Sequence, residues 1–102
     1  MHPPIIGGTY IYDHFDPAKR DWTFENRGLA FEDAETVFAG PVLTAEDTRE
    51  DYGERRFQTV GFLEGRMVMV VWTPRGGDTH VISMRKCNDR EQTRYQKRFE
   101  EG

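Results

Sequence analysis

Two arginines in the second half of the chain could together bind a phosphate group. Arg75 follows one apolar run, and Arg85 lies in the next run, two residues after Ser83. Guanidinium groups bind phosphate through planar, bidentate hydrogen bonds. Strand alternation predicts one face made of Thr79, Val81, Ser83 and Arg85, and an opposite face made of His80, Ile82, Met84 and Lys86. The face with Ser83 and Arg85 is therefore a candidate phosphate-binding surface; alternatively, Arg85 pairs with a carboxylate of the acidic first half.

His80, in the same run, is a candidate general base because imidazole titrates near neutral pH. The alternative is a half-buried, hydrogen-bonded structural histidine. The chain has no metal-ligand spacing, since its histidines and cysteine are scattered at His2, His14, His80 and Cys87. It also has neither a P-loop nor a dinucleotide-binding glycine motif. The sequence therefore predicts no metal and no cofactor.

Three short runs rich in β-branched, apolar and aromatic residues must position these side chains. They span residues 56–63, 66–73 and 78–85. Glu64-Gly65 suits a tight hairpin between the first two, and residues 74–77 join the second to the third. Residues 67–72 are almost wholly apolar, which is typical of a central strand covered on both faces. The sequence therefore predicts an antiparallel three-strand meander.

Helix signals lie on both sides of this meander. Asp16-Pro17 indicates an N-cap and first turn, and the helix that begins there should end near Arg27-Gly28. A second short helix is predicted from apolar residues that share one helical face, namely Phe31, Ala34, Val37 and Phe38. Asn88 and Glu91 form a capping pair for a last helix that ends near Glu100.

The remaining segments are predicted to be peripheral. Residues 1–9 contain two prolines and two glycines and should form a loose leader. Residues 10–15 alternate in part and are expected to form an edge strand. Residues 44–54 contain five acidic and few apolar side chains, so we expect an exposed loop there.

Length and charge limit the class of protein. The 102 residues fit a single domain, with no apolar run long enough to span a membrane and no secretory signal, so a cytoplasmic protein is expected. The net charge of −4 argues against direct nucleic-acid binding. It is unevenly distributed, with −7 over residues 1–65 and +3 over residues 66–102. The second half could therefore face RNA or an acidic protein segment, although a solvated surface gives the same asymmetry.

Several short motifs follow one another in a fixed order. They are Asp16-Pro17-Ala18-Lys19, Gly28 with Phe31-Glu32-Asp33-Ala34, Val37-Phe38, Glu54-Arg55-Arg56-Phe57, Thr59-Val60-Gly61, Gly65-Arg66, Thr73 with Arg75-Gly76, and Val81-Ile82-Ser83 with Arg85. Each motif is short, but their combined order and spacing resemble the BrnT family of toxins from bacterial type II toxin–antitoxin modules. The resemblance runs from about Phe15 to Tyr95.

This resemblance implies a RelE-like α+β fold with two N-terminal helices, a small antiparallel sheet centred on the three-strand meander, and a C-terminal helix. It also implies an endoribonuclease that cuts RNA without a metal and inhibits translation. The neutralising partner would be a BrnA-like antitoxin with a ribbon-helix-helix part. The complex would repress its own operon, so operator DNA would be contacted only through the antitoxin.

The catalytic candidates are Lys19, Arg75, Arg85, Tyr95, Glu91 and His80, and the RNA-binding candidates are Arg66 and Lys86. The resemblance assigns the phosphate charge to Arg75 and Arg85, with Lys19 as a second cation or a base. Tyr95 or His80 would exchange protons as the ribose 2′-hydroxyl attacks the adjacent phosphate.

The chain departs from the family pattern at four positions. Arg27 stands where the family usually has His, and Thr23 stands where Asn is common. Ala30 replaces the usual Ser or Thr, and His80 replaces a frequent Arg. These departures and the net negative charge support an alternative, a weakly or non-catalytic protein that binds the antitoxin and acts as a transcriptional co-repressor. The two hypotheses differ in whether Lys19, Arg75 and Arg85 converge in an open cleft or are held in ion pairs.

Overall fold

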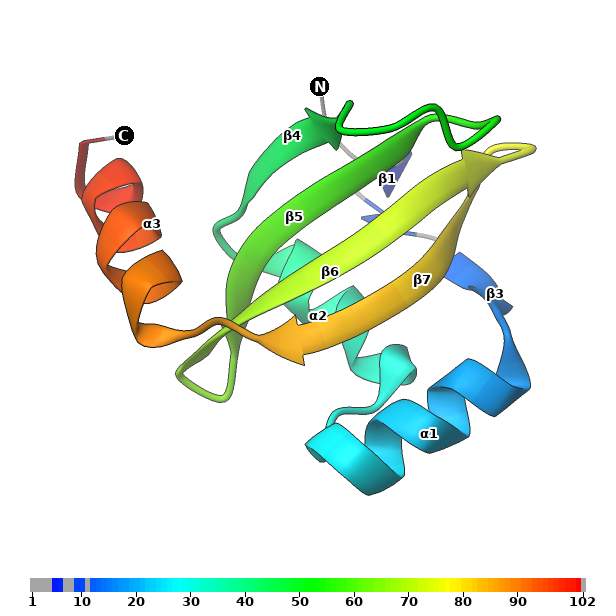
Figure 1. Cartoon of the computed structure of the whole chain (residues 1–102), viewed down its shortest axis with the longest axis horizontal. Helices are drawn as coiled ribbons and strands as arrows, with labels where there is room; N and C mark the ends of the chain where they lie inside the picture. The colour runs from blue at the N-terminus through cyan, green and yellow to red at the C-terminus, as the bar shows by residue number, and fades with distance from the viewer. Residues whose placement is uncertain (1–4, 7–8, 11, 102) are drawn as a thin grey trace.

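In the computed structural model, which describes residues 5–6, 9–10 and 12–101, a five-stranded sheet occupies the centre of the molecule (Figure 1). Its strand order is β3 (Tyr12–Phe15), β7 (Asp78–Lys86), β6 (Arg66–Arg75), β5 (Arg56–Leu63) and β4 (Leu43–Asp47). β3 runs parallel to β7, and the other neighbours are antiparallel. The predicted α+β class and the three-strand meander are therefore confirmed.

The segment before β3 is described only in part. β1 (Ile5–Ile6) and β2 (Thr9–Tyr10) form a separate antiparallel pair. Residues 1–4 and 7–8 of the expected leader, and residue 11 of the expected strand 10–15, lie outside the described residues. The described part of the predicted edge strand is Tyr12–Phe15, and Tyr10 belongs to β2 instead.

Two tight hairpins set the register of the meander. Glu64 and Gly65 have φ values of 51° and 77°, and Gly76 and Gly77 have values of 58° and 90°. Two consecutive residues with positive φ give the turn whose twist matches that of antiparallel strands. Because the second turn needs only the two glycines, Pro74 and Arg75 belong to β6, and the predicted connection 74–77 is too long.

Side-chain caps determine where the helices begin. α1 (Pro17–Arg27) starts at Asp16, whose carboxylate accepts the Ala18 amide at 2.9 Å, and ends at Gly28 with φ of 68°. α3 (Asp89–Glu101) starts with the predicted reciprocal cap. The second predicted helix is divided into a 3-10 turn, η1 (Phe31–Asp33), and α2 (Ala34–Ala39), and Ala30 supplies no side-chain cap to that turn.

The prediction of a loop over residues 44–54 is wrong for its first part. Leu43–Asp47 forms the edge strand β4, paired antiparallel with β5. Backbone hydrogen bonds to β5 hold this strand, so it does not need an apolar pattern, and Thr44 adds a 2.9 Å hydroxyl contact to Thr59. Only residues 48–55 remain as a loop.

One face of the sheet packs on α1, η1 and α2 and forms the main core. Trp72 is central to it, stacking on Phe57 with ring centroids 4.8 Å apart and meeting Phe38 edge-on at 5.8 Å. Its indole N–H donates to Thr59 Oγ1 at 2.9 Å. α2 lies behind the sheet in Figure 1, so that view shows the opposite face.

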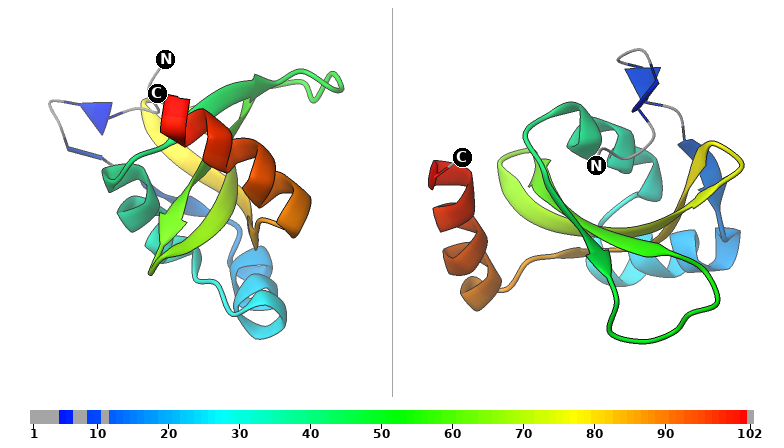
Figure 2. Two further views of the ribbon diagram at one scale, coloured as in Figure 1. Left: turned by 90° about the vertical axis from the view of Figure 1, so that its left-hand side faces the viewer. Right: turned by 90° about the horizontal axis from the view of Figure 1, so that it is seen from above.

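That opposite face, called the open face below, is defined by cross-strand pairing, since paired residues point to the same side. Its residues are Leu43, Ala45, Asp47, Arg56, Gln58, Val60, Phe62, Met67, Met69, Val71, Thr73, Arg75, Asp78, His80, Ser83 and Arg85. α3 covers one end of it, where Tyr95 and Phe99 pack against Val60, Met67, Met69 and Cys87. Figure 2 shows α3 standing at this end, apart from α1. Among the described residues, no other helix lies on the open face.

Candidate functional site

A β-bulge in β7 determines which side chains reach the open face. Val71 pairs with Ser83, whereas Trp72 pairs with Val81, so Ile82 is an extra residue in the ladder. The bulge reverses the alternation from this point on. Ser83 and Arg85 therefore share the open face with His80, not with Thr79 and Val81, and the predicted assignment of faces is wrong.

Arg85 is held by the first turn of α3. Its two terminal nitrogens lie 2.7 Å from the two carboxylate oxygens of Glu91, a bidentate pair. Glu91 also accepts the Asn88 amide at 3.0 Å, so one carboxylate both caps α3 and binds the arginine. The hydrogen bonds from Arg85 lower the pKa of Glu91 to about 2, and the carboxylate raises the pKa of Arg85. This contact fixes α3 against the sheet.

Arg75 lies at the far end of the same face. Its guanidinium is 3.3 Å from Glu54, in a pair whose side chains are 52% and 32% exposed. Arg75 pairs with Asp78, seven residues before Arg85. At ~3.3 Å per residue the two arginines are about 20 Å apart along the sheet. They can bind separate phosphates of one strand more readily than a single phosphate.

His80 and Tyr95 lie at different distances from Arg85. His80 is half-buried opposite Thr73, between the two arginines along the sheet. Tyr95, on α3, is close enough to Arg85 to contribute electrostatically to its raised pKa. Tyr95 therefore accompanies Arg85 and Glu91 at one end of the open face.

Three of the candidate residues lie away from this face. Lys19 lines a separate cavity of about 300 Å³ between α1 and the edge of β7, with Trp22, Thr23, Arg27, Ile82 and Ser83. There Arg27 donates to the Met84 carbonyl at 2.8 Å and so ties α1 to β7. Arg66 and Lys86 are exposed, and their register directs them to the side opposite Arg85.

Arg56 is a candidate that the sequence reasoning did not select. It lies on the open face, with its guanidinium 4.1 Å from the ring centroid of Tyr52. Its Nε is buried and has no hydrogen-bond partner among the described residues. Alternation within the correctly predicted strand 56–63 places Arg56 on the face of Gln58 and Val60, so the signal was present.

Asp47, also not selected, organises the loop beside Arg56. Its side chain is only 2% exposed and binds the Arg49 guanidinium at 2.8 Å, while the Tyr52 hydroxyl donates to it at 3.2 Å. The guanidinium holds the pKa of Asp47 far below its usual range. Asp47 therefore fixes the ring on which Arg56 rests.

The structure thus brings together Arg85, Glu91 and Tyr95, and places His80 and Arg75 further along the same face. Lys19 lies away from this face, and Arg75 and Arg85 are about 20 Å apart and each held in an ion pair. The three cations therefore do not converge in one cleft, and this is the arrangement expected from the co-repressor hypothesis. Within the described part of the chain, no three His, Cys, Asp or Glu side chains cluster as metal ligands would. No helix among the described residues is long and apolar enough to cross a membrane.

Comparison with known proteins bears on what this arrangement does. A family model described as "Ribonuclease toxin, BrnT, of type II toxin-antitoxin system" matches residues 15–91, about three quarters of the chain. The matched segment starts in β3 and includes α1, the whole sheet from β4 to β7, and the start of α3 up to Glu91. No curated protein matches the chain.

Proposed function

The chain belongs to the BrnT family of type II toxin–antitoxin ribonuclease toxins, and we propose that it cleaves RNA on the open face of its sheet. The proposed reaction is metal-independent, with the ribose 2′-hydroxyl attacking the adjacent phosphate. The observation that carries this proposal is the bulge at Ile82, because it turns Arg85 to the face where Glu91 binds it and Tyr95 lies nearby. These three residues supply a cation, a carboxylate and a phenol.

Arg85 is the proposed phosphate-binding residue. A phosphodiester presents the same pair of oxygens to a guanidinium as a carboxylate does, so the scissile phosphate can take the place of Glu91. Arg85 then neutralises the charge that develops on the phosphorane. Because Arg85 is 38% exposed, RNA can reach it from solvent without unfolding the sheet.

Glu91 and Tyr95 are the proposed proton-transfer groups. While Glu91 binds Arg85, its pKa of about 2 makes it a weak base. Once the phosphate displaces it, that hydrogen bond is lost, the pKa rises, and the carboxylate can accept the 2′-hydroxyl proton. Tyr95 donates a proton to the leaving oxygen. His80, the other candidate for proton transfer, lies about four strand steps or ~13 Å from Arg85 and is too far away to exchange a proton at a phosphate bound there.

The remaining cations would bind the flanking RNA. The exposed Arg75–Glu54 pair contributes only ~0–1 kcal/mol, so a backbone phosphate can replace Glu54. Arg56 presents its guanidinium on the same face, on Tyr52. Lys19 approaches the edge of β7 beside Ser83 and adds positive charge there. Arg66 and Lys86 could contact only RNA that wraps around the hairpin end of the sheet.

The family also implies an antitoxin partner. We propose a BrnA-like protein with a ribbon-helix-helix part, which would cover the open face and carry the complex to operator DNA. The site would act in the cytoplasm, where RNA and ribosomes are found. No cofactor enters the proposed reaction.

A co-repressor without effective catalysis is the second candidate. It is favoured by one observation, that Arg75 and Arg85 are both held by carboxylates of the same chain. In this case the ion pairs stabilise the fold, and the open face serves only to bind the antitoxin.

An RNA-cleavage assay in EDTA distinguishes the two functions. Purified, antitoxin-free protein is compared with Arg85→Ala, Tyr95→Phe and the exposed control Arg90→Gln, with folding checked by circular dichroism. We expect cleavage by the native protein and the control, and losses of about 100-fold in the other two variants. Full activity of folded Arg85→Ala would contradict the site. If the native protein cleaves no RNA yet binds the antitoxin tightly, the co-repressor is supported.

A further inference from the structure

A small cavity on the open face opens between α3 and the edge of the sheet. Its lining residues come from β4, β5 and α3, and they are Leu43, Thr44, Ala45, Gln58, Val60, Tyr95 and Arg98. The cavity has a volume of about 120 Å³. It is named the Tyr95 cavity here.

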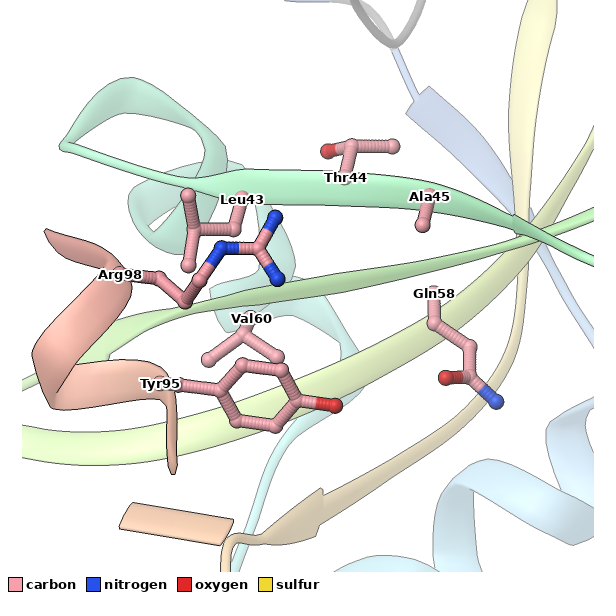
Figure 3. Close-up of a pocket in the computed structure, with 7 residues that line it drawn as sticks. All are labelled: Leu43, Thr44, Ala45, Gln58, Val60, Tyr95 and Arg98. Carbon is pink, nitrogen blue, oxygen red and sulfur yellow. The ribbon is translucent and has the colours of Figure 1, made fainter. Parts of the chain in front are cut away.

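The side chains of the Tyr95 cavity are arranged by type (Figure 3). Leu43, Ala45 and Val60 form an apolar floor on the sheet, because cross-strand pairing directs all three to the open face. The ring of Tyr95 lies over Val60, and its hydroxyl points along the sheet toward Gln58. The guanidinium of Arg98 is turned inward on the opposite side. A flat apolar slot thus has an amide at one end and a cation at the other.

We propose that the Tyr95 cavity is a nucleobase-binding subsite, in which an RNA base lies on the apolar floor against the Tyr95 ring, Gln58 reads its hydrogen-bonding edge, and Arg98 binds a neighbouring phosphate. An aromatic ring on which a base packs, combined with a cation that follows the backbone, is the usual pattern of single-strand recognition. A side-chain amide oxygen can accept a hydrogen bond from a donor on a base edge. The volume of about 120 Å³ is below the ~150 Å³ of a cavity that admits one benzene ring, so a base enters the cavity in part and leaves the rest of its ring in solvent.

The position of this cavity links it to the reaction. Tyr95 belongs to the cavity wall and also lies near Arg85, the proposed phosphate ligand. A base bound in the cavity therefore belongs to a nucleotide next to the scissile phosphate. This inference rests on the proposed function for its substrate, and it adds a specificity-determining residue, Gln58, that the family match does not assign.

Gln58 is held in an orientation suited to reading a base. Its side-chain nitrogen lies 3.5 Å from a carboxylate oxygen of Asp47, which is buried and bound by Arg49. This contact directs the amide nitrogen toward Asp47 and leaves the amide oxygen for a donor on a base, such as an exocyclic amino group. The Tyr95 cavity should therefore select a base edge that places a donor at this oxygen, which is an amino group in adenine or cytosine and a ring N–H in guanine or uracil.

The first arm of the test measures binding directly and does not need catalysis. The four ribonucleoside 3′-monophosphates are titrated into ¹⁵N-labelled protein, and the side-chain amide signal of Gln58 is followed by NMR. We expect saturable shifts of this signal, with at least a threefold difference in Kd between the best and the weakest of the four monophosphates. Gln58→Leu should abolish the preference, whereas the control Gln96→Leu, on the exposed side of α3, should keep it.

The second arm maps cleavage sites on a random RNA pool by sequencing. We expect Gln58→Leu to reduce the preference for the base beside the cut at least fivefold while the total cleavage rate falls less. Arg98→Gln should weaken RNA binding, and Arg90→Gln should not. Unchanged site preference in folded Gln58→Leu, together with no monophosphate-induced shift at Gln58, would overturn the proposal.

Two further outcomes separate this proposal from the proposed function. If the native protein cleaves no RNA but monophosphates still bind at Gln58, the subsite stands and the catalytic proposal fails. If Gln58→Leu and Arg98→Gln weaken antitoxin binding, while monophosphates do not shift the Gln58 signal, the cavity is a protein-docking site and the nucleobase proposal is wrong.

Discussion

Substitution of Glu91 by glutamine tests the central contact of the site without removing its helix cap. Glutamine keeps the size of the side chain and still accepts the Asn88 amide, as it does in many capping boxes. It lacks only the charge that binds Arg85. Glu91→Gln should therefore destabilise the fold through the ion pair alone.

The size of this effect follows from the pKa of Glu91. The hydrogen bonds from Arg85, with smaller contributions from the Asn88 amide and Arg94, lower the pKa from 4.5 to about 2. At ~1.36 kcal/mol per pH unit this shift corresponds to at most about 3 kcal/mol of stabilisation, of which the contact with Arg85 is the largest part. Arg85 is 38% exposed, so solvent screens part of the interaction. We expect a loss of about 1–2 kcal/mol, which lowers the Tm by ~4–8 °C for each kcal/mol in a domain of this size.

The direction in which the stability difference changes with pH also follows from the pKa of Glu91. Because folding lowers the pKa of Glu91, the stabilisation is complete above the unfolded value of 4.5 and is lost as the pH falls toward 2. The native protein and Glu91→Gln should therefore differ most at pH 7, by about 40% less at pH 3.5, and should converge only near pH 2. Taking the difference between variants cancels the contribution of other carboxylates, such as Asp47.

Urea unfolding, followed by the fluorescence of buried Trp72, measures this difference at pH 7 and pH 3.5. Glu100→Gln, on the exposed side of the same helix, is the control and should change stability by less than ~0.5 kcal/mol. Equal stabilities of the native protein and Glu91→Gln at pH 7 would refute the reasoning. A difference that persists unchanged at pH 3.5 would refute it too, because the loss would then arise from packing.

Three further predictions concern the scaffold that carries the site. Asp47→Asn should lower the free energy of unfolding in urea by ~1–3 kcal/mol, because it removes the charge from a buried acceptor. It should also raise protease cleavage within residues 48–55. Unchanged cleavage would count against a loop held by this carboxylate. Gly61→Ala should lower the free energy of unfolding by ~1–3 kcal/mol, because the new Cβ would lie 2.6 Å from Val37 Cγ1. Gly40→Ala is the control. Its Cβ would have its nearest neighbour at 3.9 Å, so it should be close to neutral in the same assay. Burial raises the pKa of the Cys87 thiol to about 11. Iodoacetamide at pH 8 should therefore leave the folded protein unlabelled and should label the urea-unfolded protein rapidly. Rapid labelling of the folded protein would contradict the buried position.

The sequence by itself determined the elements whose signals are local. Asp16 and Gly28 bound α1 because a cap and a left-handed residue act within one helical turn. Asn88 and Glu91 start α3 for the same reason. Glu64-Gly65 forces a tight hairpin, and with it the register of β5 against β6. The order of motifs was sufficient to identify the family, since it depends on spacing along the chain.

The tertiary structure decided features that depend on partners distant in sequence. β4 exists because β5 offers a row of backbone groups, and no pattern in its own five residues reveals this. The bulge at Ile82 adds one residue to β7 relative to β6, and this single residue moves Ser83 and Arg85 to the face of His80. A side-chain period of two makes any one-residue shift reverse every later assignment of faces. The composition of the site was therefore readable from the sequence, but its geometry depended on the pairing of the strands.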